Sequence, residues 1–183
     1  MSNLLGKRAV VVGAGIGGLA MAGALAKHFE CVVIFERDRL SRAAACRSGT
    51  PQDRHPHGLL AGGLKALGEI LPRFESDLER AGAVRVRVAQ DVQYERPDVG
   101  ALPRRDFGQT LLCASRPLIE LVLRRRVEAI ENIVLAPEWR VTGLVPVTAD
   151  QGVRAIRFET ESGHSELLEA DLVVDASGRA GSH

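Results

Sequence analysis

The hydrophobic positions near the start of the chain change their spacing twice within thirty residues. Residues 9–12 form a short β-branched run that predicts a buried parallel strand. Residues 16–28 are rich in Ala and Leu and predict a helix, and residues 31–35 predict a second buried strand that ends at Glu36. The pattern therefore predicts a strand–helix–strand unit around which the rest of the chain is organised.

Further apolar runs predict more helices and strands behind this unit. Helices are predicted over residues 59–71, 74–81 and 115–129, and strands over residues 84–88, 109–113, 133–136 and 170–178. The segment 92–108 has Pro and Gly breakers and is predicted to be irregular. At the start of the last helix, Ser115 is the expected N-cap and Pro117 suits the first turn.

Three neighbouring segments before the final strand are typical of a β-meander. Residues 139–147, 152–160 and 165–169 are predicted to be antiparallel strands. The turns are expected at residues 149–152 and 161–164. The chain therefore combines an α/β unit with a small antiparallel sheet.

The turn between the first strand and the first helix carries a G-x-G-x-x-G motif. It consists of Gly13, Ala14, Gly15, Ile16, Gly17 and Gly18, and all six are candidate cofactor-binding residues. Gly13 allows the tight turn, Gly15 lets a pyrophosphate approach the backbone, and Gly18 lets the helix pack close to the strand. The free N–H groups and the positive dipole end of the helix would face the phosphates.

Glu36 follows this motif at the tip of the second strand, 23 residues after Gly13. A carboxylate in that place can accept hydrogen bonds from the ribose hydroxyls of an adenosine. Strand, glycines, helix, strand and acid fall in the order that predicts dinucleotide binding. The alternative is a Gly-rich turn without a ligand, which is disfavoured because four glycines would then only weaken the element.

Composition narrows the range of functions. Hydrophobic residues make up 45% of the 183 residues and charged residues 26%, which is typical of one globular domain spanning residues 1–183. The formal net charge of +1 and the aromatic content of 4% give no indication of nucleic acid or of an anionic membrane as a partner. The apolar runs are too short for a membrane span or a signal peptide. Three scattered cysteines favour reduced thiols and a cytoplasmic location.

The polar side chains suggest neither a metal centre nor a catalytic constellation. His55 and His57 supply only two candidate ligands, so no metal is expected; they are either ordinary loop histidines, or one of them lines a cofactor or substrate pocket. The arginine-rich loop 37–53 is either a solvated loop or the source of a guanidinium that folds back onto a diphosphate. No Ser/His/Asp set or carboxylate pair is visible, so no catalytic side chain is named and a cofactor is expected to supply the chemistry.

Four segments resemble the para-hydroxybenzoate hydroxylase-like FAD-dependent monooxygenases. Residues 13–36 resemble their N-terminus, and residues 47–60 resemble the R-x-G-x-P-Q-x-x-H-x-H-x-L-L loop of one branch. Residues 115–118 resemble the S-R-x-L segment that opens a helix next to FAD, and residues 170–178 resemble the strand with the D-A-x-G motif. The resemblance covers nearly the whole chain, and it favours FAD where the pattern alone allows NAD or FAD.

This resemblance implies a Rossmann-like FAD-binding domain with a parallel sheet and an inserted three-stranded antiparallel meander. The residues implied at the cofactor are Gly13, Gly15 and Gly18 at the pyrophosphate, Glu36 at the ribose, Arg37 beside the adenine, Arg47 and Arg116 at the diphosphate or ribityl chain, Val141 near the adenine through its backbone, Asp175 and Gly178 near the glycine turn, and Gln52 near the flavin ring.

The length of the chain departs from the family pattern. Members are roughly twice as long, and their later Gly-Asp motif closes the flavin site. We therefore expect an N-terminal portion that ends before the C-terminal half. In the second motif, Ser177 precedes Gly178 where the family has a glycine directly after the aspartate.

The resemblance implies three alternative functions. The first is an NAD(P)H-dependent flavoprotein monooxygenase that hydroxylates a small organic substrate. The second is another flavoenzyme of the same fold, a halogenase or a prenyl reductase, although Trp139 lies in no tryptophan-rich motif of the halogenase kind. The third is a non-catalytic nucleotide-binding remnant. The sequence does not determine the substrate or the oligomeric state.

Overall fold

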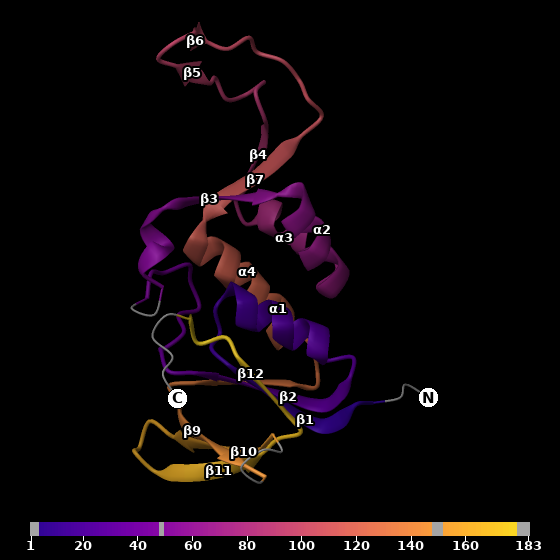
Figure 1. Cartoon of the computed structure of the whole chain (residues 1–183), viewed down its shortest axis with the longest axis vertical. Coiled ribbons are helices and arrows are strands. Elements are labelled where there is room, and N and C mark those ends of the chain that lie inside the picture. Colours follow the sequence, from indigo (N-terminus) through magenta and orange to yellow (C-terminus); the bar gives the residue numbers. More distant parts are fainter. Residues whose placement is uncertain (1–3, 48–49, 148–151, 179–183) are drawn as a thin grey trace.

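A computed structural model of the chain describes residues 4–47, 50–147 and 152–178. Its central layer is a parallel sheet with the strand order β12-β1-β2-β8. These strands are Leu172–Asp175 (β12), Gly6–Val12 (β1), Phe29–Glu36 (β2) and Ile133–Pro137 (β8). Helices α1 (Ile16–Leu25) and α4 (Arg116–Glu128) lie on one face, and the meander lies on the other (Figure 1).

The strand–helix–strand unit forms as its apolar pattern predicts, because β1 is covered on both faces. Val11 packs into the larger core together with residues of the helices, such as Leu19 and Val122. Val10 belongs to a second core with Phe158 of the meander. A parallel strand buried on both sides needs apolar residues at every position, which is why its sequence is an unbroken run.

The antiparallel meander is confirmed. Its strands are β9 (Arg140–Pro146), β10 (Val153–Glu159) and β11 (Ser165–Glu169), with β10 in the middle. Most of the turn expected at residues 149–152 lies outside the described residues. The meander packs against the sheet next to the end of β2, so its first strand borders the region where β1 and β2 end.

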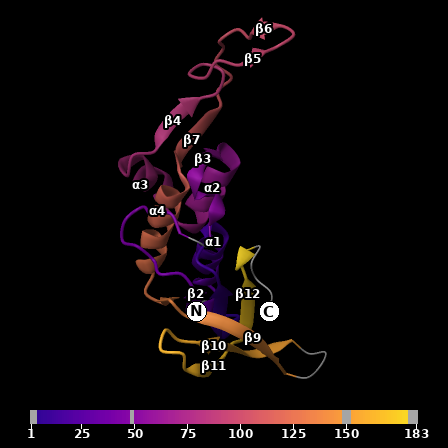
Figure 2. The ribbon, with the colours of Figure 1, turned by 90° about the vertical axis from the view of Figure 1, so that its left-hand side faces the viewer.

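A second antiparallel sheet lies beyond the helices, far from the meander (Figures 1 and 2). It has the order β3-β7-β4 and is extended by an arm in which β5 pairs with β6. These strands are β3 (Pro56–Leu60), β4 (Val84–Arg87), β5 (Glu95–Arg96), β6 (Gly100–Ala101) and β7 (Thr110–Ser115). Helices α2 (Ala61–Ile70) and α3 (Phe74–Arg80) stand beside it, and η1 (Pro51–Arg54) precedes β3.

Two local predictions were wrong in detail, and a third was confirmed. The helix expected from residue 59 begins at Ala61, because the preceding residues pair with β7 as strand β3. The first helix ends at Leu25, and a turn in which the His28 N–H donates to the Leu25 carbonyl leads into β2. The prediction of Ser115 as the N-cap residue of α4 is confirmed, although its hydroxyl makes no capping hydrogen bond.

Two glycines of the first turn are required by close approach of the backbone. Gly13 has φ +101°, and a Cβ atom there would lie 2.6 Å from the carbonyl oxygen of Ala176. A Cβ atom on Gly18 would lie 1.9 Å from the carbonyl oxygen of Gly13. Neither position can hold a side chain without moving backbone, so α1 begins directly against the end of β1.

Within the described residues, no helix has both the length and the apolar content needed to cross a bilayer.

Asp171 fastens the edge strand β12 to β1. Its carboxylate accepts the N–H groups of Lys7 at 2.7 Å and Arg8 at 2.8 Å, and these bonds lower the pKa of Asp171. A carboxyl with a lowered pKa stabilises the fold above its unfolded value of about 3.9, and this contribution is lost as the pH falls through the folded value.

We therefore expect Asp171→Asn to lower the free energy of unfolding at pH 7 and to reduce its fall between pH 5 and pH 2. Urea unfolding at several pH values measures both effects. A parallel shift of the whole curve, with an unchanged pH dependence, would contradict the role given to this carboxylate.

Candidate dinucleotide-binding site

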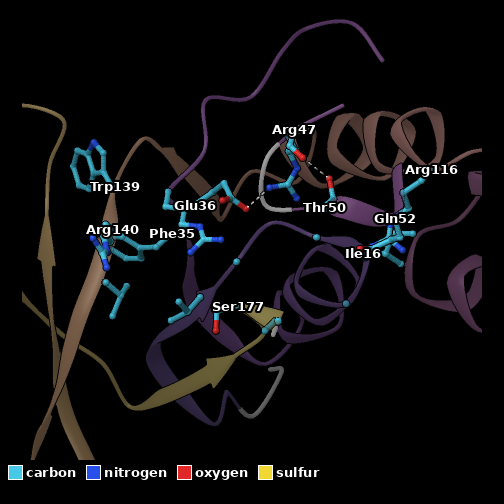
Figure 3. Close-up of a pocket in the computed structure, with 18 of the residues that line it drawn as sticks. Ile16, Phe35, Glu36, Arg47, Thr50, Gln52, Arg116, Trp139, Arg140 and Ser177 are labelled. Atoms are coloured by element: carbon cyan, nitrogen blue, oxygen red, sulfur yellow. Dashed lines mark hydrogen bonds and ion pairs between the residues drawn. The ribbon is translucent and has the colours of Figure 1, made fainter. Parts of the chain in front are cut away.

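A cavity of about 280 Å³ lies where β1 and β2 end and α1 begins (Figure 3). Its size is at the lower end of the range for small-molecule sites, about 300–1,000 Å³. The carboxyl ends of neighbouring parallel strands are where α/β sheets of this kind bind ligands. The position of the cavity therefore follows from the strand order.

The first turn of α1 faces this cavity with bare backbone. Gly15 is the N-cap residue, and within the described residues no side chain caps the helix. The Leu19 N–H donates to the Gly15 carbonyl at 2.9 Å, so the N–H groups before it need partners outside the helix. A Cβ atom on Gly15 would meet nothing nearer than 3.9 Å, and one on Gly17 nothing within 4 Å. The helix start therefore has room for an anionic group such as a phosphate.

Glu36 fixes the neighbouring wall of the cavity. Its side chain is only 6% exposed, and Oε2 accepts the Ala14 N–H at 2.9 Å while Oε1 accepts the Asp38 N–H at 3.0 Å. The carboxylate thus joins the glycine turn to the end of β2. Each carboxylate oxygen can accept more than one hydrogen bond, so Glu36 retains capacity for a ligand hydroxyl.

Arg47 reaches this wall from the loop after β2. Its Nη1 donates to Glu36 at 2.9 Å and to Asp38 at 3.1 Å, and its Nη2 donates to Glu120 at 3.2 Å. Burial alone would lower the pKa of Arg47, but the three carboxylates outweigh burial and hold this pKa above its ordinary value. Arg47 therefore stays charged, and its guanidinium is held in one place.

The loop around Arg47 is fixed by a buried carboxylate of its own. Asp53 accepts the Arg47 N–H at 3.0 Å, and the hydroxyl of Thr50 donates to the same oxygen. The Thr50 N–H donates to the Arg47 carbonyl at 3.1 Å. These bonds hold the backbone of the loop from which the guanidinium extends.

Helix α4 contributes a second arginine and a shared counter-ion. Arg116, at the first position of the helix, donates to Glu120 Oε1 at 2.9 Å from its Nε atom. Glu120 Oε2 accepts from both the Nε and the Nη2 atoms of Arg47. One carboxylate therefore binds two guanidinium groups that both line the cavity.

The end of the cavity next to the meander is aromatic. Trp139 stacks on Phe158 with ring centroids 5.2 Å apart and an interplanar angle of 6°, and Phe35 lies 4.9 Å from Phe158. The Trp139 N–H donates to the Glu36 carbonyl at 3.1 Å, which ties the start of the meander to the end of β2. Trp139 and Arg140 lie at one end of the cavity, and Gln52 and Arg116 lie at the other (Figure 3).

The structure brings most of the sequence-predicted residues to this one cavity. Those that line it are Gly13, Gly15, Ile16, Gly17, Glu36, Arg37, Arg47, Gln52, Arg116, Val141 and Gly178. Ala14 contributes through its N–H bond to Glu36, and Gly18 through its packing on Gly13. Asp175 ends β12 and accepts the Ser177 N–H at 2.9 Å beside the cavity rather than in its wall.

Sequence reasoning missed the remaining wall of the cavity and its counter-ion. The unpredicted lining residues are Val12, Phe35, Thr50, Trp139, Arg140, Thr142, Ala176 and Ser177. Glu120 could have been found, because it follows Arg116 by four residues on a predicted helix, a spacing that places opposite charges side by side. No local signal pointed to Trp139, which reaches the site through tertiary packing alone.

The histidine pair forms no part of this site. His57 lies in β3, and its Nδ1 atom is 2.8 Å from the carbonyl oxygen of His55, the residue before that strand. Across the described ranges, no group of three or more His, Cys, Asp or Glu side chains is placed to hold a metal ion.

Comparison with known proteins identifies the first part of the chain. The family model described as "NAD(P)-binding Rossmann-like domain" matches residues 11–64. This segment contains the glycine turn, Glu36 and Arg47. The sheet and helices around this segment have a Rossmann-like fold.

Solved flavoproteins have the same architecture over nearly the whole chain. A probable FAD-dependent monooxygenase, PqsL of Pseudomonas aeruginosa, is 17% identical with a TM-score of 0.68, and the match covers 96% of this chain and 43% of that one. The p-nitrophenol 4-monooxygenase PnpA of Pseudomonas putida is 18% identical with a TM-score of 0.69, over 100% and 43%. The myxobacterial FAD-dependent halogenase CndH is 18% identical with a TM-score of 0.70, over 96% and 38%. The chain has the fold of the N-terminal part of these flavoproteins.

A curated protein of Mycobacterium tuberculosis, Protein Rv3254, is 34% identical over 187 residues. The match covers 93% of this chain and 38% of that protein. The chain therefore spans well under half the length of the proteins that it matches.

Proposed function

We propose that residues 1–183 form the FAD-binding domain of a flavoprotein monooxygenase and that FAD binds in the cavity at the start of α1. The observation that carries this proposal is the bare first turn of α1 beside the buried Glu36 carboxylate. The open backbone at Gly15 leaves room for a diphosphate. The Glu36 carboxylate accepts the Ala14 N–H although the two residues are 22 apart in sequence, and this position suits the adjoining ribose.

The two ends of the cavity support one orientation of the cofactor. The adenine would lie next to Trp139, Arg37 and the backbone of Val141, where an aromatic surface and a guanidinium are available. The diphosphate would cross the N-terminus of α1, and the ribityl chain would extend toward Arg116 and Gln52. Bound FAD would supply the redox chemistry of the complete enzyme.

The role of this chain is to bind and orient the cofactor. Glu36 would accept ribose hydroxyls, and the N–H groups at the start of α1 would donate to phosphate oxygens. Arg47 and Arg116 would offset the charge of the diphosphate. The substrate, which we propose to be a small organic molecule, and reduction by NAD(P)H belong to the complete protein.

A halogenase is the second candidate, since the halogenase CndH matches the fold as well as the monooxygenases do. The domain described here would bind FAD in the same way in both. An assay of the full-length protein with NADH or NADPH separates the two. Hydroxylation without halide supports the monooxygenase, whereas halide-dependent product formation supports the halogenase.

Titration of the chain with FAD, FMN and ADP tests cofactor binding directly. Trp139 is the only tryptophan of the chain and lines the cavity, so its fluorescence reports occupancy. We expect saturable quenching by FAD, a saturable response to ADP, and neither with FMN, which lacks the adenosine. Absence of any response to FAD and ADP, confirmed by calorimetry, would contradict the proposal.

We expect Glu36→Gln to weaken FAD binding by about 1–3 kcal/mol, the scale for hydrogen bonds to a charged group. Because the carboxylate is proposed to bind the adenosine ribose, ADP affinity should fall by the same factor. The matched control is Glu30→Gln on the exposed side of the same strand, which should leave both affinities unchanged. Equal affinities for Glu36→Gln and the unaltered chain would show that the ribose lies elsewhere.

A further inference from the structure

Glu120 is a buried carboxylate that bridges two cations of the cavity without lining the cavity itself. It is 6% exposed and lies one helical turn after Arg116 on α4. Its two oxygens divide their partners: Oε1 binds Arg116 at 2.9 Å, and Oε2 binds Arg47 at 3.2 and 3.3 Å. The two arginines come from distant segments, and this carboxylate binds both of them.

The position of Glu120 is unfavourable for anion binding unless the carboxylate serves another purpose. A Cβ atom on Gly15 would lie 3.9 Å from Glu120 Oε1, so the negative charge adjoins the turn that faces the proposed diphosphate. A bare carboxylate there would repel an anionic ligand. Its two guanidinium partners offset this charge: Glu120, Arg47 and Arg116 together carry +1, while Glu36 and Asp38 also bind Arg47.

Held guanidinium groups bind an anion better than free ones do. An unrestrained arginine side chain loses conformational freedom when it binds a ligand, and a side chain already fixed by a partner avoids most of that cost. Arg47 is also held by Glu36 and Asp38, whereas Glu120 is the carboxylate that reaches both arginines.

We propose that Glu120 is a positioning residue of the diphosphate site and that it acts through Arg47 and Arg116. This inference rests on the proposed binding of an adenine dinucleotide. The carboxylate fixes both guanidinium groups at the cavity wall before the ligand arrives. Its removal should therefore weaken binding of ligands that carry phosphate, even though it also removes a negative charge.

The test compares the full chain with its Glu120→Gln variant, using ADP and adenosine as ligands in calorimetric titrations. We expect ADP affinity to fall about tenfold, the scale of losing the restraint on two long side chains. Adenosine affinity should stay within twofold, because adenosine has no diphosphate. General damage to the fold would lower both affinities, so the pair of ligands separates positioning from a structural role.

Two further variants make the result specific. Glu128→Gln removes the same charge from an exposed position of the same helix and should leave ADP affinity unchanged. In an Arg116→Ala background, Glu120→Gln should reduce ADP affinity by a clearly smaller factor, since one of the two restrained groups is already absent. This coupling is measurable even if Glu120→Gln lowers the stability of the chain.

The outcomes are distinct. Unchanged or tighter ADP binding by Glu120→Gln would overturn the inference, as would an equal loss for adenosine or an undiminished effect in the Arg116→Ala background. If the unaltered chain binds neither FAD nor ADP, the proposed function itself fails and the role of Glu120 fails with it. If the unaltered chain binds both and only the Glu120 results disagree, the proposed function stands without this inference.

Discussion

Alanine in place of Gly18 is expected to lower the free energy of unfolding by about 3 kcal/mol, the upper end of typical overpacking costs. The added Cβ atom would lie 1.9 Å from the Gly13 carbonyl oxygen, which is backbone and cannot rotate away. Gly13 is itself held against Ala176, so the strain passes to the neighbouring strand. Because α1 would move away from β1, the binding of FAD should be lost together with stability.

Gly17→Ala is the matched control for this prediction. It makes the same change one residue earlier in the same helix, where an added Cβ atom meets nothing within 4 Å. Alanine is a better helix former than glycine by about 1 kcal/mol, so stability should stay equal or rise. Chemical unfolding followed by circular dichroism measures both variants. If the two variants lose the same stability, close helix–strand contact is not the reason for Gly18.

Replacement of Arg47 by alanine is expected to cost about 3–5 kcal/mol of stability, the scale for removing one partner of a buried ion pair. Arg47 is 13% exposed, and Glu36, Asp38 and Glu120 are each 12% exposed or less. Without the guanidinium, three neighbouring carboxylates would face one another with little access to water. The loss of stability in Arg47→Ala therefore combines the lost attraction to the guanidinium with repulsion among the three carboxylates.

The sign of the pH dependence follows from the raised pKa of Arg47. A cation whose pKa is raised in the folded state contributes its stability at every pH below its unfolded pKa, and it loses that contribution only as the pH rises through the folded pKa, far above neutral. The titration of Arg47 itself therefore adds no pH dependence to stability between pH 6 and pH 9. Urea unfolding over this range measures the expected loss, with Arg42→Ala in the same loop as the control. A loss below about 1 kcal/mol would place Arg47 among weak surface ion pairs.

The local sequence was sufficient wherever a contact lies within a few residues. The unbroken run of β1, the G-x-G-x-x-G turn and the acid at the end of β2 predict a strand–helix–strand unit, and the structure confirms it. The meander is confirmed for the same reason, because alternating positions and turn residues are local signals. The ligand contacts assigned to these residues stay predictions until FAD binding is measured.

Local sequence signals do not predict which segments pair when they are distant along the chain. Leu59 and Leu60 continue the apolar spacing of the helix after them, yet they pair with β7 as part of strand β3. Trp139 belongs to the cavity because its ring packs on Phe158 and its backbone N–H donates to the backbone carbonyl of Glu36. Periodicity along the chain carries no information on either partner.

The sequence by itself determined the Rossmann unit and the bare helix start that a diphosphate can approach, because glycine sterics and apolar periodicity act between near neighbours. Only the tertiary structure decided which charges meet there. Arg116 and Glu120 are neighbours along α4, but Arg47 joins them only because the loop after β2 packs against that helix. A charge at one position of a sequence does not specify a partner many residues away, and folding around a shared core supplies that partner.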